Sequence, residues 1–328
     1  MPLGEFGLIG RYFQRAALEQ AGGHTKVALG IGDDAALLTP TPGWQWVIST
    51  DSLVQGVHFP EHYSPQDLGY RALAVAVSDL AAMAATPVGF TLALTLPAVD
   101  EHWLQAFSTG LAACARDHRI SLIGGDTTRG PLNIGVSVFG EAPQGQALRR
   151  AGARPGDLLC VGGPLGDGAA GLAVVLEQGL PDNLAAPARE YLAARFWRPR
   201  AQCELGVALA GIASAGLDVS DGLLQDAGHL AGASVVALHI HGADLPCSAA
   251  LRAWPAAQQR EWMLRGGDDY VLLFTLPPEH AALVAQWAGQ GWPVRVIGEA
   301  AAGSGVWLDG QATGGAGGYQ HFKESKHG

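Results

Sequence analysis

The sequence has 328 residues, 48% of them hydrophobic, which is enough chain for two domains with a sizeable buried core. A formal net charge of −10 argues against a nucleic-acid or anionic-membrane partner, although divalent metals can still mediate nucleotide binding to an acidic protein. The four cysteines include no C-x-x-C pair, and the first residues carry neither a basic region nor an apolar core, so we expect a cytoplasmic protein with reduced thiols.

Helical and strand-like patterns alternate along the first half of the chain. In chain order we expect an amphipathic helix over 5–20, a strand over 46–54, a helix over 66–85, a strand over 88–96, a helix over 100–118, and strands over 120–123 and 132–140. Residues 142–157 are then rich in Gly, Pro and Arg, which indicates a domain boundary. We therefore predict an N-terminal domain over 1–145 and a C-terminal domain over 146–328.

The second half mixes the same two patterns. We expect strands over 158–161, 235–241, 270–276 and 294–298, and helices over 186–196, 201–213 and 221–232. Mixed patterns in both halves predict α/β or α+β domains. The order of the strands cannot be deduced from these patterns.

Aspartates recur at the ends of apolar runs, each beside Gly, Ser or Thr. The stretches are Gly30-Ile31-Gly32-Asp33-Asp34, Ser49-Thr50-Asp51, Ser78-Asp79, Gly124-Gly125-Asp126, Asp218-Val219-Ser220-Asp221 and Gly266-Gly267-Asp268-Asp269. Taken singly, most of them are equally well explained as turn residues, and Ser220 or Asp221 as a helix N-cap. Asp79 is harder to explain in this way, because it lies in an apolar helical stretch and a buried carboxylate needs a partner.

A divalent metal is an attractive partner for these carboxylates. Clustered carboxylates repel one another unless cations neutralise them, and few basic residues lie near Asp79 in sequence. Carboxylate and hydroxyl oxygens without His or Cys ligands suit a hard cation such as Mg²⁺.

Residues 166–171 read Gly-Asp-Gly-Ala-Ala-Gly, which matches the glycine pattern of dinucleotide-binding loops. The following stretch, 184–200, is helical, so no acidic residue ends a second strand where that fold needs one. A helix N-terminus that binds phosphate and a tight packing turn both remain open for this loop. No Gly-Lys-Ser/Thr sequence occurs, so a P-loop is excluded.

Taken together, the motifs resemble those of bacterial thiamine-monophosphate kinases, in the aminoimidazole-ribonucleotide-synthetase-like superfamily. The resemblance runs from Gly4 to about Phe322 and rests on the order of the aspartate stretches, together with Gly4-Glu5-Phe6, Ser78-Asp79-Leu80-Ala81-Ala82-Met83, Asp218-Val219-Ser220-Asp221-Gly222-Leu223 and Gly318-Tyr319. It implies a homodimer in which two N-terminal domains share a β-barrel, while a C-terminal α/β domain completes each chain.

The resemblance also implies roles for individual residues. Several Mg²⁺ ions would be bound by Asp34, Ser49, Thr50, Asp51, Asp79, Asp126, Asp218 and Asp221. ATP would be contacted by Gly125, Asp126, Arg150 and Ser220, and thiamine monophosphate by His58, Asp268 and Tyr319. The family has Glu in a Gly-Gly-Glu-Asp-Tyr motif where this chain has Asp268, one methylene shorter.

The implied reaction transfers the γ-phosphoryl group of ATP to thiamine monophosphate. The acceptor phosphate has a second pKa of about 6, so it is already anionic and needs no general base. Metal-assisted, direct in-line transfer therefore fits a sequence rich in carboxylates.

The alternatives are another ATP-dependent enzyme of the superfamily, an NAD-dependent oxidoreductase, or a non-enzymatic protein that binds Ca²⁺ or nucleotides. Within the superfamily, these alternatives are an enzyme similar to aminoimidazole ribonucleotide synthetase, a hydrogenase-maturation ATPase and a selenophosphate synthetase. The last of these would need a reactive Cys near the N-terminus, and the first cysteine is Cys114.

Overall fold

The structure, a computed structural model, describes residues 5–23 and 26–314. The chain divides into two compact units. The first comprises the described residues up to Ala147 together with Trp197–Ala210, and the second comprises Leu148–Phe196 and the described residues from Gly211 onwards. Among the described residues, no helix has the length and apolar character needed to cross a membrane.

The first unit begins with short helical segments in place of the single helix expected over 5–20. These are α1 (Glu5–Leu8), a π-helical turn (Ile9–Phe13) and α2 (Ala16–Glu19). The N–H of Gln14 donates to the carbonyl of Ile9 at 2.8 Å, and Arg15 is extended. The predicted continuous helix is therefore wrong. The π-helical turn and the extended Arg15 change the direction of the chain, and both Phe13 and Leu18 are buried as a result.

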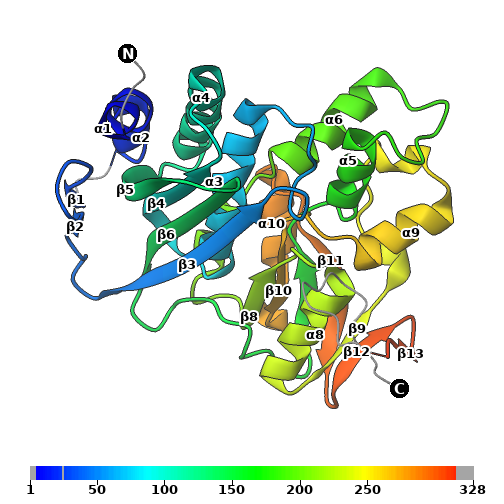
Figure 1. Ribbon diagram of the computed structural model, residues 1–328. Helices are drawn as coiled ribbons and strands as arrows, with labels where there is room; N and C mark the ends of the chain where they lie inside the picture. Colours follow the sequence, from blue (N-terminus) through cyan, green and yellow to red (C-terminus); the bar gives the residue numbers. More distant parts are fainter. Residues whose placement is uncertain (1–4, 24–25, 315–328) are drawn as a thin grey trace, which may run out of the picture. The chain divides into compact units, whose positions relative to one another are not determined.

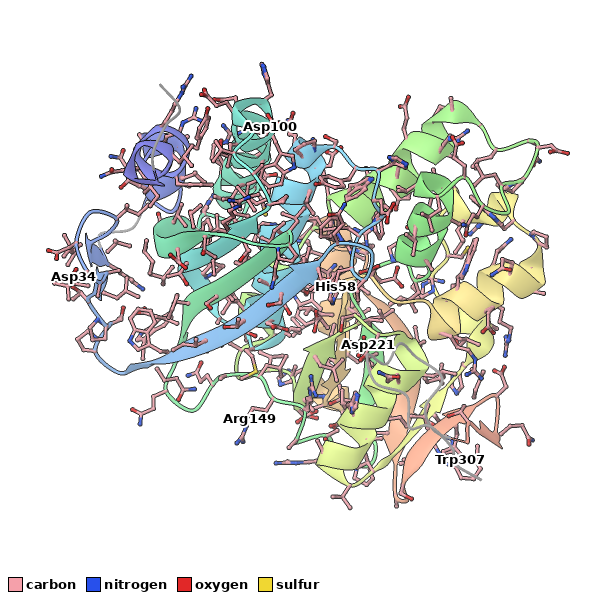
Figure 2. All side chains as sticks on the ribbon, in the orientation of Figure 1. Asp34, His58, Asp100, Arg149, Asp221 and Trp307 are labelled. Atoms are coloured by element: carbon pink, nitrogen blue, oxygen red, sulfur yellow. The ribbon has the colours of Figure 1, made fainter. Side chains whose placement is uncertain are left out.

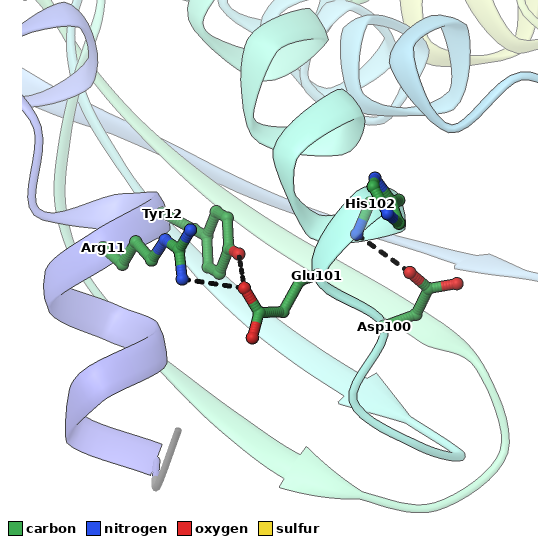
Figure 3. A network of polar contacts seen from close by, with 5 residues as sticks. All are labelled: Arg11, Tyr12, Asp100, Glu101 and His102. Atoms are coloured by element: carbon green, nitrogen blue, oxygen red, sulfur yellow. Dashed lines mark hydrogen bonds and ion pairs between the residues drawn. The ribbon is translucent and has the colours of Figure 1, made fainter. Parts of the chain in front are cut away.

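Side chains on the π-helical turn and on α4 (Glu101–Asp117) join these two segments (Figure 3). The Arg11 guanidinium and the Tyr12 hydroxyl both donate to Oε2 of Glu101, at 2.7 and 3.2 Å. The preceding residue, Asp100, caps α4 by accepting the N–H groups of His102 and Trp103.

A four-stranded sheet forms the centre of the first unit (Figure 1). In spatial order its strands are β3 (Trp44–Val54), β6 (Asn133–Pro143), β4 (Thr86–Leu96) and β5 (Ser121–Arg129). β6 is antiparallel to both β3 and β4, and β5 is parallel to β4. A small hairpin of β1 (Val27–Leu29) and β2 (Leu37–Leu38) precedes the sheet.

Helices α3 (Pro65–Ala82) and α4 pack against each other, and α3 also packs on the strands. Ser64 begins α3 by accepting the Asp67 N–H, and Pro65 occupies the first turn. Gly110 of α4 lies directly over α3, because a Cβ there would lie 1.7 Å from the carbonyl oxygen of Gln66. The helix pair is therefore closer at this point than any side chain would allow.

The opposite face of the sheet is open. Residues of β3 alternate, so Val47 and Leu53 are buried, whereas Ile48 is 60% exposed, Trp44 39% and Val54 37%. Strands β3 and β5 are the edges of this sheet. The described residues of one chain thus form an open sheet and no closed barrel.

The segment Trp197–Ala210 packs in the first unit although the chain on both sides of it belongs to the second. Its helix α7 (Cys203–Leu209) contacts α3. Arg198 forms an ion pair with Asp67 at 2.7 Å and lies over the ring of Tyr70. No sequence signal indicated this return of the chain.

The second unit contains a seven-stranded sheet. In spatial order its strands are β13 (Gln311–Ala312), β12 (Gly305–Leu308), β9 (Ala237–Ile240), β11 (Arg295–Ala301), β7 (Leu158–Val161), β10 (Leu272–Leu276) and β8 (Ala215–Asp218). All neighbours are antiparallel except β9 and β12. The strands expected around 158–161, 235–241, 270–276 and 294–298 are confirmed.

Helices surround this sheet. They are α5 (Asp167–Val175), α6 (Ala186–Trp197), α8 (Leu223–Ser234), α9 (Ala256–Arg265) and α10 (Ala282–Gly289), with 3₁₀ turns at Gly242–Asp244, Leu251–Ala253 and Pro278–His280. Leu217, Leu230 and Leu273 belong to the core between α8 and the strands. Trp287 of α10 packs edge-on against Phe274, which alternates with Leu273 along β10 and so faces the other side of the sheet. Mixed α/β architecture is therefore confirmed for both units.

Candidate functional site

In the first unit, β3 and α3 bring together three of the predicted metal ligands. Ser49 and Asp51 follow Val47 by steps of two along β3, which places them on the helix-covered face. The Ser49 hydroxyl donates to Oδ2 of Asp79 on α3. A polar partner for the carboxylate of this apolar helix was predicted, and within the protein Ser49 supplies one.

Two further predicted ligands lie on other positions of the same sheet. Thr50 faces the open side, where its hydroxyl lies 2.8 Å from that of Ser137. Asp126 is exposed on β5, in register with Ala93 of β4. Asp51 and Asp126 lie on the two edge strands, so three inter-strand spacings separate them, or roughly 14 Å.

Asp34 and His58 lie in segments before and after β3. Asp34 is exposed beside the β1–β2 hairpin, far from His58 at the other end of β3 (Figure 2). Nδ1 of His58 accepts the Val54 N–H at 3.0 Å. The neutral ring therefore carries its proton on Nε2, which makes that nitrogen a hydrogen-bond donor.

In the second unit, β8 ends at Asp218, which is buried, and a turn leads into α8. The turn is stabilised by Asp226, whose Oδ2 accepts the N–H groups of Ser220, Asp221 and Gly222, each at 3.1 Å. Gly222 is the N-cap, at φ 118°, and no side chain caps the helix in the usual way. The alternative explanation of Ser220 or Asp221 as an ordinary N-cap is therefore wrong.

Burial raises the pKa of Asp226 to about 7. The hydrogen bond from the Asp221 N–H lowers this pKa, whereas the nearby negative charges of Asp221 and Asp218 raise it further. The turn thus gathers three carboxylates. Asp221 is further oriented by Gln225, whose amide donates to Oδ2 at 3.0 Å. The local excess of negative charge suits a cation, as the sequence predicts for Asp218 and Asp221.

The loop over 266–270 lies against this turn. The N–H of Asp268 donates to the Ser220 carbonyl at 2.9 Å, and that of Tyr270 to the Val219 carbonyl at 2.8 Å. Asp268 and Tyr270 both have left-handed backbones, with φ of 67° and 51°. The Tyr270 hydroxyl donates to Oδ1 of Asp268 at 3.0 Å. This hydrogen bond orients the Asp268 carboxylate, whose side chain is one methylene shorter than the Glu of the family motif.

The glycine pattern at 166–171 is a packing turn. Both oxygens of the Asp269 carboxylate are engaged by backbone N–H groups of this turn, from Gly166 at 2.7 Å and Gly168 at 2.9 Å. These two donors are therefore not available for a ligand phosphate. Moreover, both neighbours of β7 are antiparallel to it, so β7 and α5 are not part of a dinucleotide-binding βαβ unit.

The remaining predicted residues are less constrained. The side chain of Arg150 is exposed, and its carbonyl accepts the Ser234 hydroxyl at 2.8 Å. Gly125 lies so close to β4 that a Cβ there would be 2.1 Å from the Leu92 carbonyl oxygen. Tyr319 lies outside the described residues. Within the described part of the chain, no group of three or more His, Cys, Asp or Glu side chains is already arranged to hold a metal ion.

The two carboxylates that fix these turns, Asp226 and Asp269, were not among the residues predicted to have a role. Asp226 carried a weak signal, because it lies in the otherwise apolar start of a helix. Asp269 lies in the stretch Gly266-Gly267-Asp268-Asp269, but nothing in the sequence distinguishes it from a turn residue, since its partners lie more than a hundred residues earlier in the chain.

Two family models match the chain. The N-terminal domain of AIR synthase related proteins matches residues 32–142, and the C-terminal domain of the same proteins matches residues 154–309. A thiamine-monophosphate kinase from Salmonella typhimurium is 46% identical over 304 residues, which cover 92% of each chain. The chain belongs to the thiamine-monophosphate kinase family.

Solved structures agree with this family. The thiamine-monophosphate kinase from Stenotrophomonas maltophilia has a TM-score of 0.85 at 45% identity and covers 95% of this chain and 98% of its own. AaThiL complexed with AMPPCP and TMP has a TM-score of 0.78 at 32% identity and covers 98% of this chain and 99% of its own. The predicted membership of the thiamine-monophosphate kinase family is thus confirmed, and all the aspartates predicted as ligands lie inside the two matched segments.

Proposed function

We propose that this chain catalyses the ATP-dependent phosphorylation of thiamine monophosphate to thiamine diphosphate. The observation that carries the proposal is 46% identity to a thiamine-monophosphate kinase over 92% of both chains. It is supported by the likeness along nearly the whole chain to AaThiL, whose structure holds AMPPCP and TMP. The chain is accordingly an enzyme, a phosphotransferase whose acceptor is itself a phosphate.

The chemistry requires neutralisation of charge more than proton transfer. The acceptor phosphate is anionic near neutral pH, since its second pKa is about 6, so a general base is unnecessary. Bound Mg²⁺ would supply the charge neutralisation that the transfer needs. The residues that fit Mg²⁺ are hard oxygen donors, and the paired Ser49 and Asp79 with neighbouring Asp51 form one such group.

A second group is the turn after β8, where Asp218 and Asp221 lie close to Asp226. We assign Asp126 and Thr50 to further ligand positions on the open side of the sheet. We propose that more than one ion is bound, because roughly 14 Å of sheet separates Asp51 from Asp126. Asp34 joins the set only if the β1–β2 hairpin moves or a second copy of the chain supplies it.

We assign the remaining predicted residues by their chemistry. Asp126, the Gly125 backbone, Ser220 and Arg150 contact ATP, with Arg150 supplying a positive charge for its phosphates. The Nε2 proton of His58 suits an oxygen of the acceptor phosphate. The Asp268 carboxylate accepts a hydrogen bond from the aminopyrimidine of thiamine monophosphate. Tyr319, outside the described residues, holds the thiazolium by a cation–π contact.

We further propose a functional division of the chain and a homodimer. Residues 1–145 form the domain for ATP, Mg²⁺ and dimerisation, and residues 146–328 form the C-terminal α/β domain. The support for dimerisation is the open face of the four-stranded sheet with its exposed Trp44, Ile48 and Val54. Two such faces packed together would form the shared β-barrel.

A coupled kinase assay with a panel of acceptors tests the proposed function. Thiamine monophosphate should give Mg²⁺-dependent turnover, whereas free thiamine should give little, because its hydroxyl needs a base that the site does not provide. Titration with NADH is the control for a dinucleotide enzyme and should show no binding. Equal turnover of thiamine and its monophosphate would contradict the mechanism.

A further inference from the structure

Asp269 lies next to the predicted substrate residue Asp268 and is completely buried in the second unit. Its carboxylate accepts two N–H groups from the start of α5, those of Gly166 and Gly168. Its own carbonyl accepts Nη2 of Arg195 on α6 at 2.8 Å. One residue thus ties the 266–270 loop to two helices through both its side chain and its backbone.

The residues on either side of Asp269 have an unfavourable backbone conformation. Asp268 and Tyr270 are not glycines, yet both have positive φ, a conformation that persists only where surrounding contacts impose it. Their N–H groups are fixed on the turn that carries Ser220. The start of α5 contacts the same loop. A Cβ at Gly168 would lie 2.4 Å from the carbonyl carbon and oxygen of Asp268, so only glycine fits against this peptide.

We infer that Asp269 is a positioning residue for the reaction, which holds the 266–270 loop between α5 and the 218–222 turn so that Asp268 is fixed for thiamine monophosphate. The inference rests on the proposed function for the identity of the substrate. It adds a residue that does not touch substrate, and it gives the Gly166–Gly171 turn a role in shaping the substrate loop instead of binding phosphate.

A second buried carboxylate in the same region provides a matched comparison. Asp167, at the start of α5, is also fully buried. It accepts the hydroxyls of Tyr191 at 2.8 Å and Ser248 at 2.6 Å, which belong to other segments than the 266–270 loop. Loss of either carboxylate should disturb the packing around α5, but only loss of Asp269 should disturb Asp268.

The test compares Asp269→Asn with Asp167→Asn. An amide offers one acceptor and one donor group, so in Asp269→Asn one of the two N–H groups of the turn meets a donor instead of an acceptor. We expect the KM for thiamine monophosphate to rise about tenfold, as for a lost hydrogen bond to a charged group, while the KM for ATP changes less than about twofold. Asp167→Asn should lower the Tm and leave both KM values unchanged.

A second pair of variants guards against failure of Asp269→Asn to fold. Gly168→Ala pushes on the Asp268 peptide and leaves Asp269 in place. Gly171→Ala, in the same helix, would instead meet the Leu192 carbonyl oxygen at 2.2 Å. Both should lower the Tm, but only Gly168→Ala should raise the KM for thiamine monophosphate. Equal effects of the two substitutions on that KM would overturn the inference.

Hydrogen exchange of the 266–270 amides separates this inference from the proposed function, because it needs no turnover. Exchange of these amides should speed up in Asp269→Asn and stay unchanged in Asp167→Asn. If the loop amides respond as expected but wild-type protein does not phosphorylate thiamine monophosphate, the proposed function fails and the substrate named here fails with it. If wild type is active but Asp269→Asn changes neither the loop amides nor the KM, the positioning role is wrong.

Discussion

At the scale of single residues, buried carboxylates in the second unit shape the turns that carry the predicted ligands. Asp226 accepts three consecutive N–H groups and Asp269 accepts two. Burial raises the pKa of each to about 7, against the opposing effect of those N–H groups. Burying these two carboxyl groups costs desolvation free energy, and their hydrogen bonds to backbone N–H groups hold each turn in one conformation.

Sequence alone indicated the candidate ligands Asp51, Asp79 and Asp218 more readily than these supports. Asp51 and Asp218 each end an apolar run, and Asp79 interrupts one. Asp269 stands beside Asp268 and Asp226 lies in the first turns of a helix, and only hydrogen bonds that form on folding distinguish these two carboxylates. The same limit applies to Ser49, whose bond to Asp79 joins residues of a strand and a helix.

Asp51→Asn should lower turnover by about 100-fold or more, because metal neutralisation of phosphoryl charge is worth several kcal/mol and each ~1.4 kcal/mol is tenfold. The reason is the loss of one charged ligand beside Ser49 and Asp79. Initial rates measured over a range of Mg²⁺ concentrations check this, and added Mg²⁺ should restore part of the loss.

Asp100→Asn is the matched control, because Asp100 caps α4 and Asn caps helices equally well. Its turnover should equal that of wild type. If Asp51→Asn keeps the wild-type rate at limiting Mg²⁺, the assignment of Asp51 as a ligand is wrong.

At the scale of helices and strands, regular patterns predicted the elements that position the site. The strands β3 and β4 and the helices α3 and α4 were expected within a few residues of their observed bounds. Close approaches between elements, such as that of Gly110 to Gln66, were not predictable, because they depend on which backbone segments contact each other in the folded chain. Helices α9 and α10 and the strands β1, β2, β8, β12 and β13 were missed. The break at Arg15 follows from tertiary packing.

Gly110→Ala should destabilise the protein by about 1–3 kcal/mol or more, since overpacking at a backbone contact forces α3 and α4 apart. Gly228→Ala on α8 is the matched control, because a Cβ there meets nothing within 4 Å. That variant should gain about 0.5–1 kcal/mol from helix propensity. Calorimetric unfolding of both variants checks the opposite signs, and a Tm of Gly110→Ala equal to wild type would refute the close helix contact.

At the scale of the whole molecule, the chain passes between its two units three times, near residues 147, 196 and 210. Hydrophobic patterns and the Gly-, Pro- and Arg-rich segment over 142–157 predicted two domains. The patterns could not predict that Trp197–Ala210 returns to the first unit, because α7 looks like any amphipathic helix until its partner α3 is known. For the same reason they could not order the strands of the second sheet.

The open sheet face leads to a prediction about assembly. Light scattering should give about twice the chain mass of 33.9 kDa at micromolar concentration. Ile48→Lys places a charge on the open face and should shift the protein toward monomer, because an unpaired charge is costly in an interface. Val99→Lys, on an exposed loop before α4, is the control and should leave the mass unchanged. A monomeric wild type would contradict the proposed dimer.

The central claim is direct transfer of a phosphoryl group from ATP to the phosphate of thiamine monophosphate. The most direct measurement is a single-turnover reaction with ATP labelled in its γ-phosphate, Mg²⁺ and thiamine monophosphate, followed by analysis of every labelled species. Our account predicts that the label appears in the terminal phosphate of thiamine diphosphate, with none attached to the protein. Label found only in inorganic phosphate, or held covalently by the chain, would contradict it.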